Sequence, residues 1–253
     1  MTPPIHRRIL IAPNPGSERH LELSLMGAFE LVDEAVPVVL TGASQRLLAF
    51  VALQGRAVTR TATAGALWPD VSDAQAHASL RSAIWRLEET AREALSVDVL
   101  DLDLAPHVLL DVRGAEALAH RLLLVDTMPS DQDITAEAIS ALSSELLPDW
   151  YDDWAILRAE DWRQLRLHAL EALAVKVAAI GRYSDAIQAV RAAIRVDPLR
   201  ESARSILVRI HLAEGNQSEA LREMATYREQ LARDLGIEPT SQFNALLDPP
   251  TET

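Results

Sequence analysis

A six-residue pattern near the end of the chain repeats after 34 residues. The segment Gly181–Ala186 (GRYSDA) returns as Gly215–Ala220 (GNQSEA), and Leu173 maps onto Leu207 by the same shift. Helical repeat proteins have periods of this length, because one helix pair cannot bury its apolar face without a neighbouring pair. The pattern therefore predicts stacked antiparallel helices in the C-terminal part of the chain.

The spacing of Gly and Ala refines this prediction. In tetratricopeptide repeats a Gly ends the first helix of each pair, and a small Ala near the start of the second helix allows close packing. Pro198 ends one of the repeats and Pro239 follows the last long helix. We expect an all-α domain of tetratricopeptide-like helices over residues 113–247, followed by a tail over residues 248–253.

The N-terminal part has a different pattern. Residues 1–20 are rich in Pro and polar groups and predict a flexible tail. Short apolar segments at 21–29 and 36–40, with a turn at Asp33-Glu34, predict a small β-meander. Three segments with helical spacing follow, at residues 44–54, 61–68 and 73–95. Two strands come next, residues 97–104 and 108–112, which are separated by Pro106 and are predicted to form a hairpin.

Strands, three helices and a terminal hairpin are the order of a winged helix–turn–helix domain. We expect this domain over residues 21–112, and the third helix would be the one that enters the DNA major groove. The predicted fold class is therefore mainly α with a small β part: an N-terminal winged helix–turn–helix domain followed by an all-α tetratricopeptide-like repeat domain.

Charge and composition exclude several classes of protein. The 24 basic and 37 acidic residues give a net charge of −13, so the chain does not coat nucleic acid non-specifically. The net charge is −4 over residues 1–110 and −9 over residues 111–253. No stretch approaches the roughly 18 apolar residues that cross a bilayer. Pro3, Pro4, Pro13 and Pro15 lie where a signal peptide needs an apolar segment. We expect a cytoplasmic protein without membrane contact.

Motifs for catalysis are missing from the sequence. The chain has no Cys, its seven His are scattered, and no Gly-x-Ser-x-Gly elbow or Gly-rich phosphate loop occurs. The acidic groups around Asp131 and Asp149 lack the Gly turn or His ligand of a metal site. We therefore expect no enzyme activity, no cofactor and no metal.

Several motifs stand in a characteristic order along the chain. They are Leu40–Ala49 (LTGASQRLLA), Val58–Arg60, Ala66–Asp70 (ALWPD), Ala78–Leu87 (ASLRSAIWRL), Leu146–Trp154 (LLPDWYDDW), Asp197–Glu201 (DPLRE) and Leu235–Thr240 (LGIEPT). With these motifs the chain resembles the SARP family of antibiotic regulatory proteins, in which an OmpR-type winged helix precedes a bacterial transcriptional activator domain. The resemblance covers about residues 21–247.

The resemblance implies a transcription activator that binds double-stranded DNA. It implies recognition of tandem direct repeats near a promoter, by a homodimer or by protomers side by side, and a contact with RNA polymerase. On a helical wheel the third helix presents a polar face, and two further Arg begin the first two helices. The candidate DNA-binding residues are Arg46, Arg60, Gln75, Ser79, Arg81, Ser82, Trp85 and Arg86.

Two points stay open at this stage. Trp85 either stacks on a sugar or packs under the wing. Glu88 and Glu89 stand where relatives carry Arg-rich sequence, and Pro106-His107 replaces the Gly-Tyr that is common in the wing. The alternative to a DNA-binding activator is therefore a tetratricopeptide interaction module whose winged helix has lost strong DNA binding.

One aromatic stripe is predicted to belong to the core. Trp150, Trp154 and Trp162 are separated by four and eight residues, which places them on one face of a helix. We expect all three to be core residues.

Overall fold

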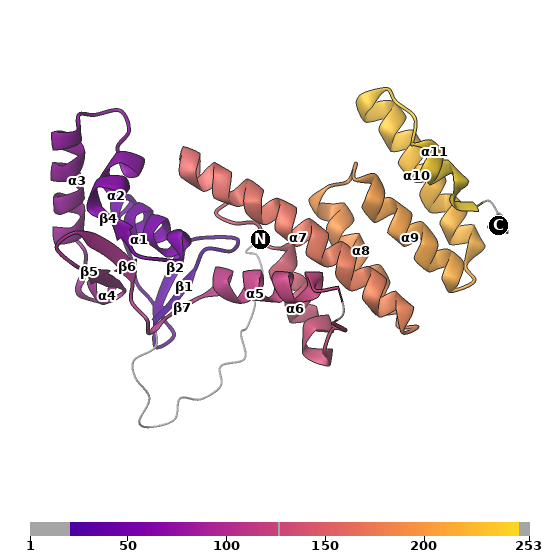
Figure 1. The fold of residues 1–253 in the computed structure, drawn as a ribbon, viewed down its shortest axis with the longest axis horizontal. Coiled ribbons are helices and arrows are strands. Elements are labelled where there is room, and N and C mark those ends of the chain that lie inside the picture. The colour runs from indigo at the N-terminus through magenta and orange to yellow at the C-terminus, as the bar shows by residue number, and fades with distance from the viewer. Residues whose placement is uncertain (1–20, 126, 248–253) are drawn as a thin grey trace, which may run out of the picture. The chain divides into compact units, whose positions relative to one another are not determined.

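The computed structural model describes residues 21–125 and 127–247, and these form two compact units (Figure 1). The N-terminal unit contains residues 21–23 and 30–109. The helical unit contains Ser24–Phe29 and residues 110–247. Within the described ranges no helix is both long and apolar enough to cross a membrane. The predicted tails, residues 1–20 and 248–253, lie outside the described residues.

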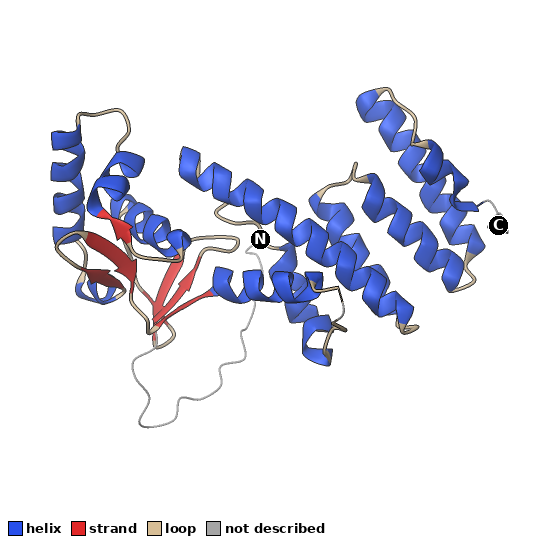
Figure 2. Cartoon of the chain, viewed as in Figure 1, coloured by secondary structure: helices blue, strands red, loops and turns tan. Residues whose placement is uncertain are grey.

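Two small sheets lie in the N-terminal unit (Figure 2). One has the strand order β3-β2-β1-β7 and the other the order β4-β6-β5. In the second sheet, β6 is the central strand, and Leu102 faces Val58 on one side and Val97 on the other. The strands are β1 (Leu21–Ser24), β2 (Glu30–Asp33), β3 (Val36–Pro37), β4 (Val58–Thr59), β5 (Leu95–Val97), β6 (Asp101–Leu104) and β7 (Val108–Leu110).

Three helices pack together in this unit: α1 (Gly42–Gln54), α2 (Arg60–Leu67) and α3 (Asp73–Trp85). Helices α1 and α2 also contact the second sheet, at β6 and β4 respectively. The Thr41 side chain accepts a hydrogen bond from the backbone of Ser44 and so begins α1. Gly55 ends α1 in the left-handed conformation (φ 65°), which L side chains rarely adopt. Leu48, Leu80 and Leu102 are fully buried between these elements. The predicted winged helix–turn–helix is confirmed.

The predicted hairpin between residues 97–104 and 108–112 is wrong. The wing is the antiparallel pair β5–β6, whereas β7 belongs to the other sheet. The wing turn is closed by the Asp98 amide, which donates to the Asp101 carbonyl at 2.9 Å. This turn carries neither Gly nor Pro, so Pro106, which lies in the connection to β7, gave a misleading turn signal.

The helical unit contains long antiparallel helices that pack in sequence order, α7 on α8, α8 on α9 and α9 on α10. The segment Ser24–Phe29 joins this unit, since the amides of Leu25 and Met26 donate to the Asp111 carboxylate at the start of α5. The elements are α5 (Asp111–Leu123), η1 (Asp131–Ile134), α6 (Ala136–Ser143), α7 (Asp153–Ala179), α8 (Tyr183–Val196), α9 (Glu201–Ala213), α10 (Gln217–Leu235), α11 (Ser241–Asn244) and η2 (Ala245–Leu247).

The 34-residue repeat is confirmed in its hydrogen bonds. The amide of Gly181 donates to the Ala178 carbonyl at 2.9 Å, and the amide of Gly215 donates to the Leu212 carbonyl at 3.1 Å. Both Gly residues have φ well above zero, at 77° and 87°. The two small residues of the pattern, Ala186 and Ala220, are fully buried. The tetratricopeptide-like helical domain follows from these equivalent turns.

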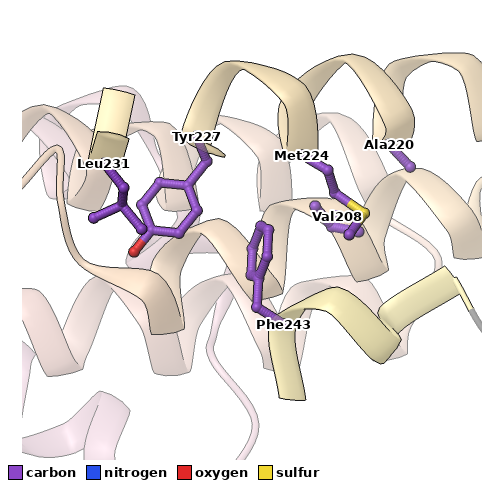
Figure 3. Close-up of a cluster of buried hydrophobic side chains, with 6 residues drawn as sticks. All are labelled: Val208, Ala220, Met224, Tyr227, Leu231 and Phe243. Carbon is purple, nitrogen blue, oxygen red and sulfur yellow. The ribbon is translucent and has the colours of Figure 1, made fainter. Parts of the chain in front are cut away.

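The last helices close this unit around an apolar cluster. Figure 3 shows the ring of Phe243 from α11 between Tyr227 of α10 and the pair of Met224 of α10 and Val208 of α9. Leu231 of α10 belongs to the same cluster and lies on the other side of Tyr227. The rings of Tyr227 and Phe243 lie 4.9 Å apart, and the Tyr227 hydroxyl donates to the Leu199 carbonyl at 3.0 Å. This contact gives the short α11 a buried anchor.

The predicted tryptophan stripe is correct for Trp162 only. Trp162 is 2% exposed, and its indole N–H donates to the Ser144 carbonyl at 2.9 Å. Trp150 and Trp154 are half-buried. The Trp150 ring stacks on Phe29 at 6.1 Å and meets the edge of Trp154 at 5.9 Å. Because α7 begins at Asp153, helical spacing does not apply to Trp150.

Candidate nucleic-acid interface

Helix α3 has one buried face and a capped start. Ala76, Leu80 and Ala83 are its buried residues. The backbone N–H and the hydroxyl of Ser72 donate to Gln75 Oε1 at 3.3 and 3.1 Å. This half of a capping box fixes the first turn. Gln75 is one of the predicted DNA-binding residues. Its side-chain carbonyl oxygen accepts the hydrogen bonds of the cap, so only its amide NH₂ can donate to another partner.

The remaining predicted residues of α3 share the opposite face. Arg81 is exposed, and Ser79 and Ser82 are half-buried. Within residues 21–125 and 127–247, the Arg81 guanidinium has no carboxylate partner. Its five N–H donors suit a phosphate or a guanine edge. Trp85 is 79% exposed, which excludes packing under the wing and leaves its ring on the surface beside Arg81, one turn away.

The predicted third helix over residues 73–95 is wrong in its second half. Helix α3 ends at Trp85, Arg86 is its C-cap, and a separate short helix, α4 (Glu89–Glu93), follows. Leu87, which lies between the two helices, is buried. Arg92 on α4 donates from Nη2 to the carbonyls of Trp85 and Leu87, both at 3.0 Å, and so satisfies the end of α3.

This break separates the acids from the candidate DNA face. Glu88 is the N-cap of α4 and Glu89 its first residue. The charged residues of α3 itself are Asp73 and Arg81, so its net charge is zero, compared with −1 for the predicted helix over residues 73–95. Negative charge at the start of α4 is favourable for the dipole of that helix.

The two Arg at the helix starts are bound to the protein itself. Arg46 Nη2 donates to the carbonyl of Leu67, the last residue of α2, at 3.0 Å. Arg60 Nε donates to the Asp98 carbonyl at 3.0 Å, and its backbone amide donates to the Leu100 carbonyl at 2.8 Å. Arg46 therefore caps α2, and Arg60 fixes the wing turn. Sequence alone shows neither role, because each acceptor is a backbone carbonyl.

The wing turn has an apolar and acidic surface. Val99 is 82% exposed and Leu100 72% exposed, and they lie between Asp98 and Asp101. Carboxylates repel DNA phosphates, and exposed aliphatic side chains offer phosphates no donor. The wing turn therefore offers DNA phosphates no side-chain donor.

Comparison with known proteins places the second half of the chain in a family. Residues 110–248 match the model of the bacterial transcriptional activator domain. The regulatory protein AfsR of Streptomyces griseus is 29% identical over 206 residues, which are 74% of this chain and 20% of that protein. AfsR of Streptomyces coelicolor is 29% identical over 197 residues, 71% of this chain and 19% of that protein. The chain spans about a fifth of the length of these relatives.

A solved structure supports the fold. Mycobacterium tuberculosis EmbR, determined in complex with a low affinity phosphopeptide, superposes with a TM-score of 0.66 at 23% identity. The match covers 90% of this chain and 64% of EmbR. The expected SARP arrangement, a winged helix followed by an activator domain, is confirmed. The chain thus belongs to the family of the bacterial transcriptional activator domain.

Proposed function

We propose that the chain binds double-stranded DNA sequence-specifically through α3 and activates transcription. The winged helix–turn–helix domain over residues 21–112 would contact DNA, and the activator domain over residues 113–247 would contact protein. The sites would be tandem direct repeats near a promoter, occupied by protomers side by side or by a homodimer.

One observation carries the DNA-binding proposal. The Arg81 guanidinium is exposed in the middle of a helix whose other face is anchored by Leu80, and no carboxylate of the described residues neutralises it. This helix carries the unpaired Arg81, the hydroxyl of Ser82 and the exposed indole of Trp85. In the major groove they would offer hydrogen-bond donors and a stacking surface to DNA.

Charge supports a protein partner for the helical domain. Residues 111–253 carry a net charge of −9, which disfavours contact with DNA phosphates. The resemblance to the SARP family implies RNA polymerase near the promoter as this partner. The proposal therefore assigns DNA to the N-terminal unit and polymerase to the helical unit.

The test is titration of the purified full chain on a DNA site selected from genomic fragments, compared with scrambled DNA. Arg81→Ala and Arg86→Ala should each weaken specific binding by about 1–3 kcal/mol if the residue contacts a base. With three or four phosphates neutralised per protomer, the logarithmic salt slope should be about −3 to −4 per protomer, at roughly −0.9 per phosphate.

Arg56→Ala is the matched control, since Arg56 is an exposed Arg of the same unit that donates only to the neighbouring Ala57 carbonyl. It should leave specific binding unchanged. If the variants of Arg81 and Arg86 bind both DNA probes as tightly as wild type, α3 is not the DNA-binding helix.

The wing turn favours a second candidate function. The exposed pair Val99 and Leu100 suits an apolar protein surface better than DNA. In this alternative the winged helix is part of an interaction module and has lost strong DNA binding. Selection from genomic fragments separates the two functions, because an interaction module would enrich no DNA sequence. In this alternative, Leu100→Ser would abolish binding of a protein partner.

A further inference from the structure

Helices α6 and α8 pack against each other in the helical unit (Figure 1). A pocket of about 330 Å³ between them opens to solvent. Its wall on α6 is apolar, formed by Ala136 and Ile139. Its wall on α8 is polar and basic, formed by Gln188, Arg191 and Arg195. The volume lies at the lower end of the range for sites that bind small molecules.

The two arginines differ from most others in this unit. Residues 111–247 contain 14 Arg, and 10 of them donate to a carboxylate, a side-chain amide or a carbonyl. Within the described residues Arg191 and Arg195 have no such partner, and neither do Arg113 and Arg209. Two of these four unpaired cations therefore line one pocket, although the unit as a whole has an excess of acids.

The local sequence explains why the pair is not neutralised. Arg191 and Arg195 are four residues apart, so they are neighbours on the surface of α8 and repel each other. The other helical neighbours of Arg191 are Ile187, Gln188 and Ile194, none of which is acidic. An anion placed between the two guanidinium groups would remove this repulsion and accept bidentate hydrogen bonds.

We propose that this pocket binds a small carboxylate with a short aliphatic body. The carboxylate would lie between Arg191 and Arg195 and accept a further hydrogen bond from the Gln188 amide. The aliphatic part would cover Ala136 and Ile139. Inorganic phosphate would contact only the polar wall on α8, whereas an organic acid would also contact the apolar wall on α6. The apolar wall therefore favours an organic acid over inorganic phosphate.

The test is an amide chemical-shift titration of the full chain with acetate, butyrate, hexanoate and inorganic phosphate at constant ionic strength. Hexanoate should bind saturably, with shifts confined to α6 and α8. Affinity should rise along the series of carboxylates by about two- to fourfold for each CH₂ that the wall covers. Phosphate should bind more weakly than hexanoate.

Two kinds of variant localise the site. Arg191→Ala and Arg195→Ala should each weaken hexanoate binding about tenfold, while the melting temperature without ligand stays equal or rises because the repulsion is relieved. Ala136→Glu should block the pocket, because its carboxylate would pair with the arginines, and an acid at the first position of α6 is favourable for folding. Ala136→Gln is the control for added bulk.

Arg209→Ala provides the matched charge control, since Arg209 is an exposed and unpaired Arg of the neighbouring helix α9. It should leave hexanoate affinity unchanged. The proposal is overturned if hexanoate binds no better than acetate, or if Arg209→Ala weakens binding as much as Arg191→Ala does.

Discussion

The Arg92 guanidinium donates to the backbone carbonyl of Trp85 at 3.0 Å. The same nitrogen donates to the Leu87 carbonyl, so one side chain of α4 satisfies the end of α3 and the turn that follows it. Positive charge is favourable at this place because the C-terminus of a helix carries partial negative charge. The position of Trp85 on the candidate DNA face thus depends on a residue outside α3.

Arg92→Ala should lower the free energy of unfolding of the N-terminal unit by about 1 kcal/mol, the typical net value of a hydrogen bond. It should also loosen the end of α3. Urea unfolding measures the first effect, and hydrogen exchange of the amides of residues 83–87 measures the second. Arg81→Ala removes the same charge without a hydrogen bond and should leave both quantities unchanged. Equal behaviour of the two variants would contradict the role of Arg92.

Trp162→Ala should cost about 3–5 kcal/mol of stability because the side chain is fully buried and leaves a cavity. Trp162→Phe should cost less, since it keeps most of the apolar contact and loses the hydrogen bond to the Ser144 carbonyl. Trp150→Ala, at a half-buried position, is expected to cost less than Trp162→Ala. Chemical unfolding of the three variants gives the order, and a cost for Trp150→Ala above that for Trp162→Ala would show that the burial argument fails.

The helical repeat was predictable because its determinants are local and recur. The turn needs a positive φ, which favours Gly at position 181, and the close packing of the helices needs a small residue, which favours Ala at position 186. The same requirements recur 34 residues later. The end of α3 lacked such a signal. No Gly or Pro stands at residues 86–88, and the carbonyls at the end of the helix are satisfied by Arg92, a donor from the next helix that residue types do not reveal.

The candidate site was predictable only in part for a similar reason. Helical spacing placed Arg81 and Trp85 on one exposed face of α3. The partners of Arg46 and Arg60 are backbone carbonyls brought near by folding, which residue types do not reveal. The sequence shows two Arg four residues apart, Arg191 and Arg195, which places two like charges on one face of α8. The apolar wall of their pocket comes from the packing of α6, which the sequence does not show.

The Asp133 carboxyl should make the helical unit sensitive to acid. Burial would raise the pKa of Asp133, but hydrogen bonds from Arg121 at 2.6 Å and from Ser130 outweigh it and hold the pKa below its ordinary value of 3.8. The ionised form is therefore stabilised by folding. This stability is present above the unfolded pKa and is lost as the pH falls through the folded pKa.

Asp133→Asn should accordingly be less stable than wild type near neutral pH, and the difference should shrink as the pH falls below about 4. Urea unfolding of both proteins over a pH series measures it. Glu137→Gln on the adjacent helix α6 controls for the loss of one carboxylate, because Glu137 is exposed. A difference between wild type and Asp133→Asn that stays constant down to pH 2 would contradict this reasoning.

Arg60 tests whether the start of α2 binds DNA or holds the wing. Arg60 Nε donates to the Asp98 carbonyl, so Arg60→Ala should lower the stability of the wing by about 1 kcal/mol. A structural role predicts an unchanged logarithmic salt slope of DNA binding, whereas loss of a phosphate contact would reduce the slope by about one. If Arg60 instead contacts a phosphate, Arg60→Lys, which keeps the charge but not the planar guanidinium, should restore the slope without restoring the hydrogen bond. Measured together, thermal unfolding and a salt series on the selected DNA site separate the roles: a reduced slope with unchanged stability would show that Arg60 contacts DNA and that its bond to Asp98 contributes little.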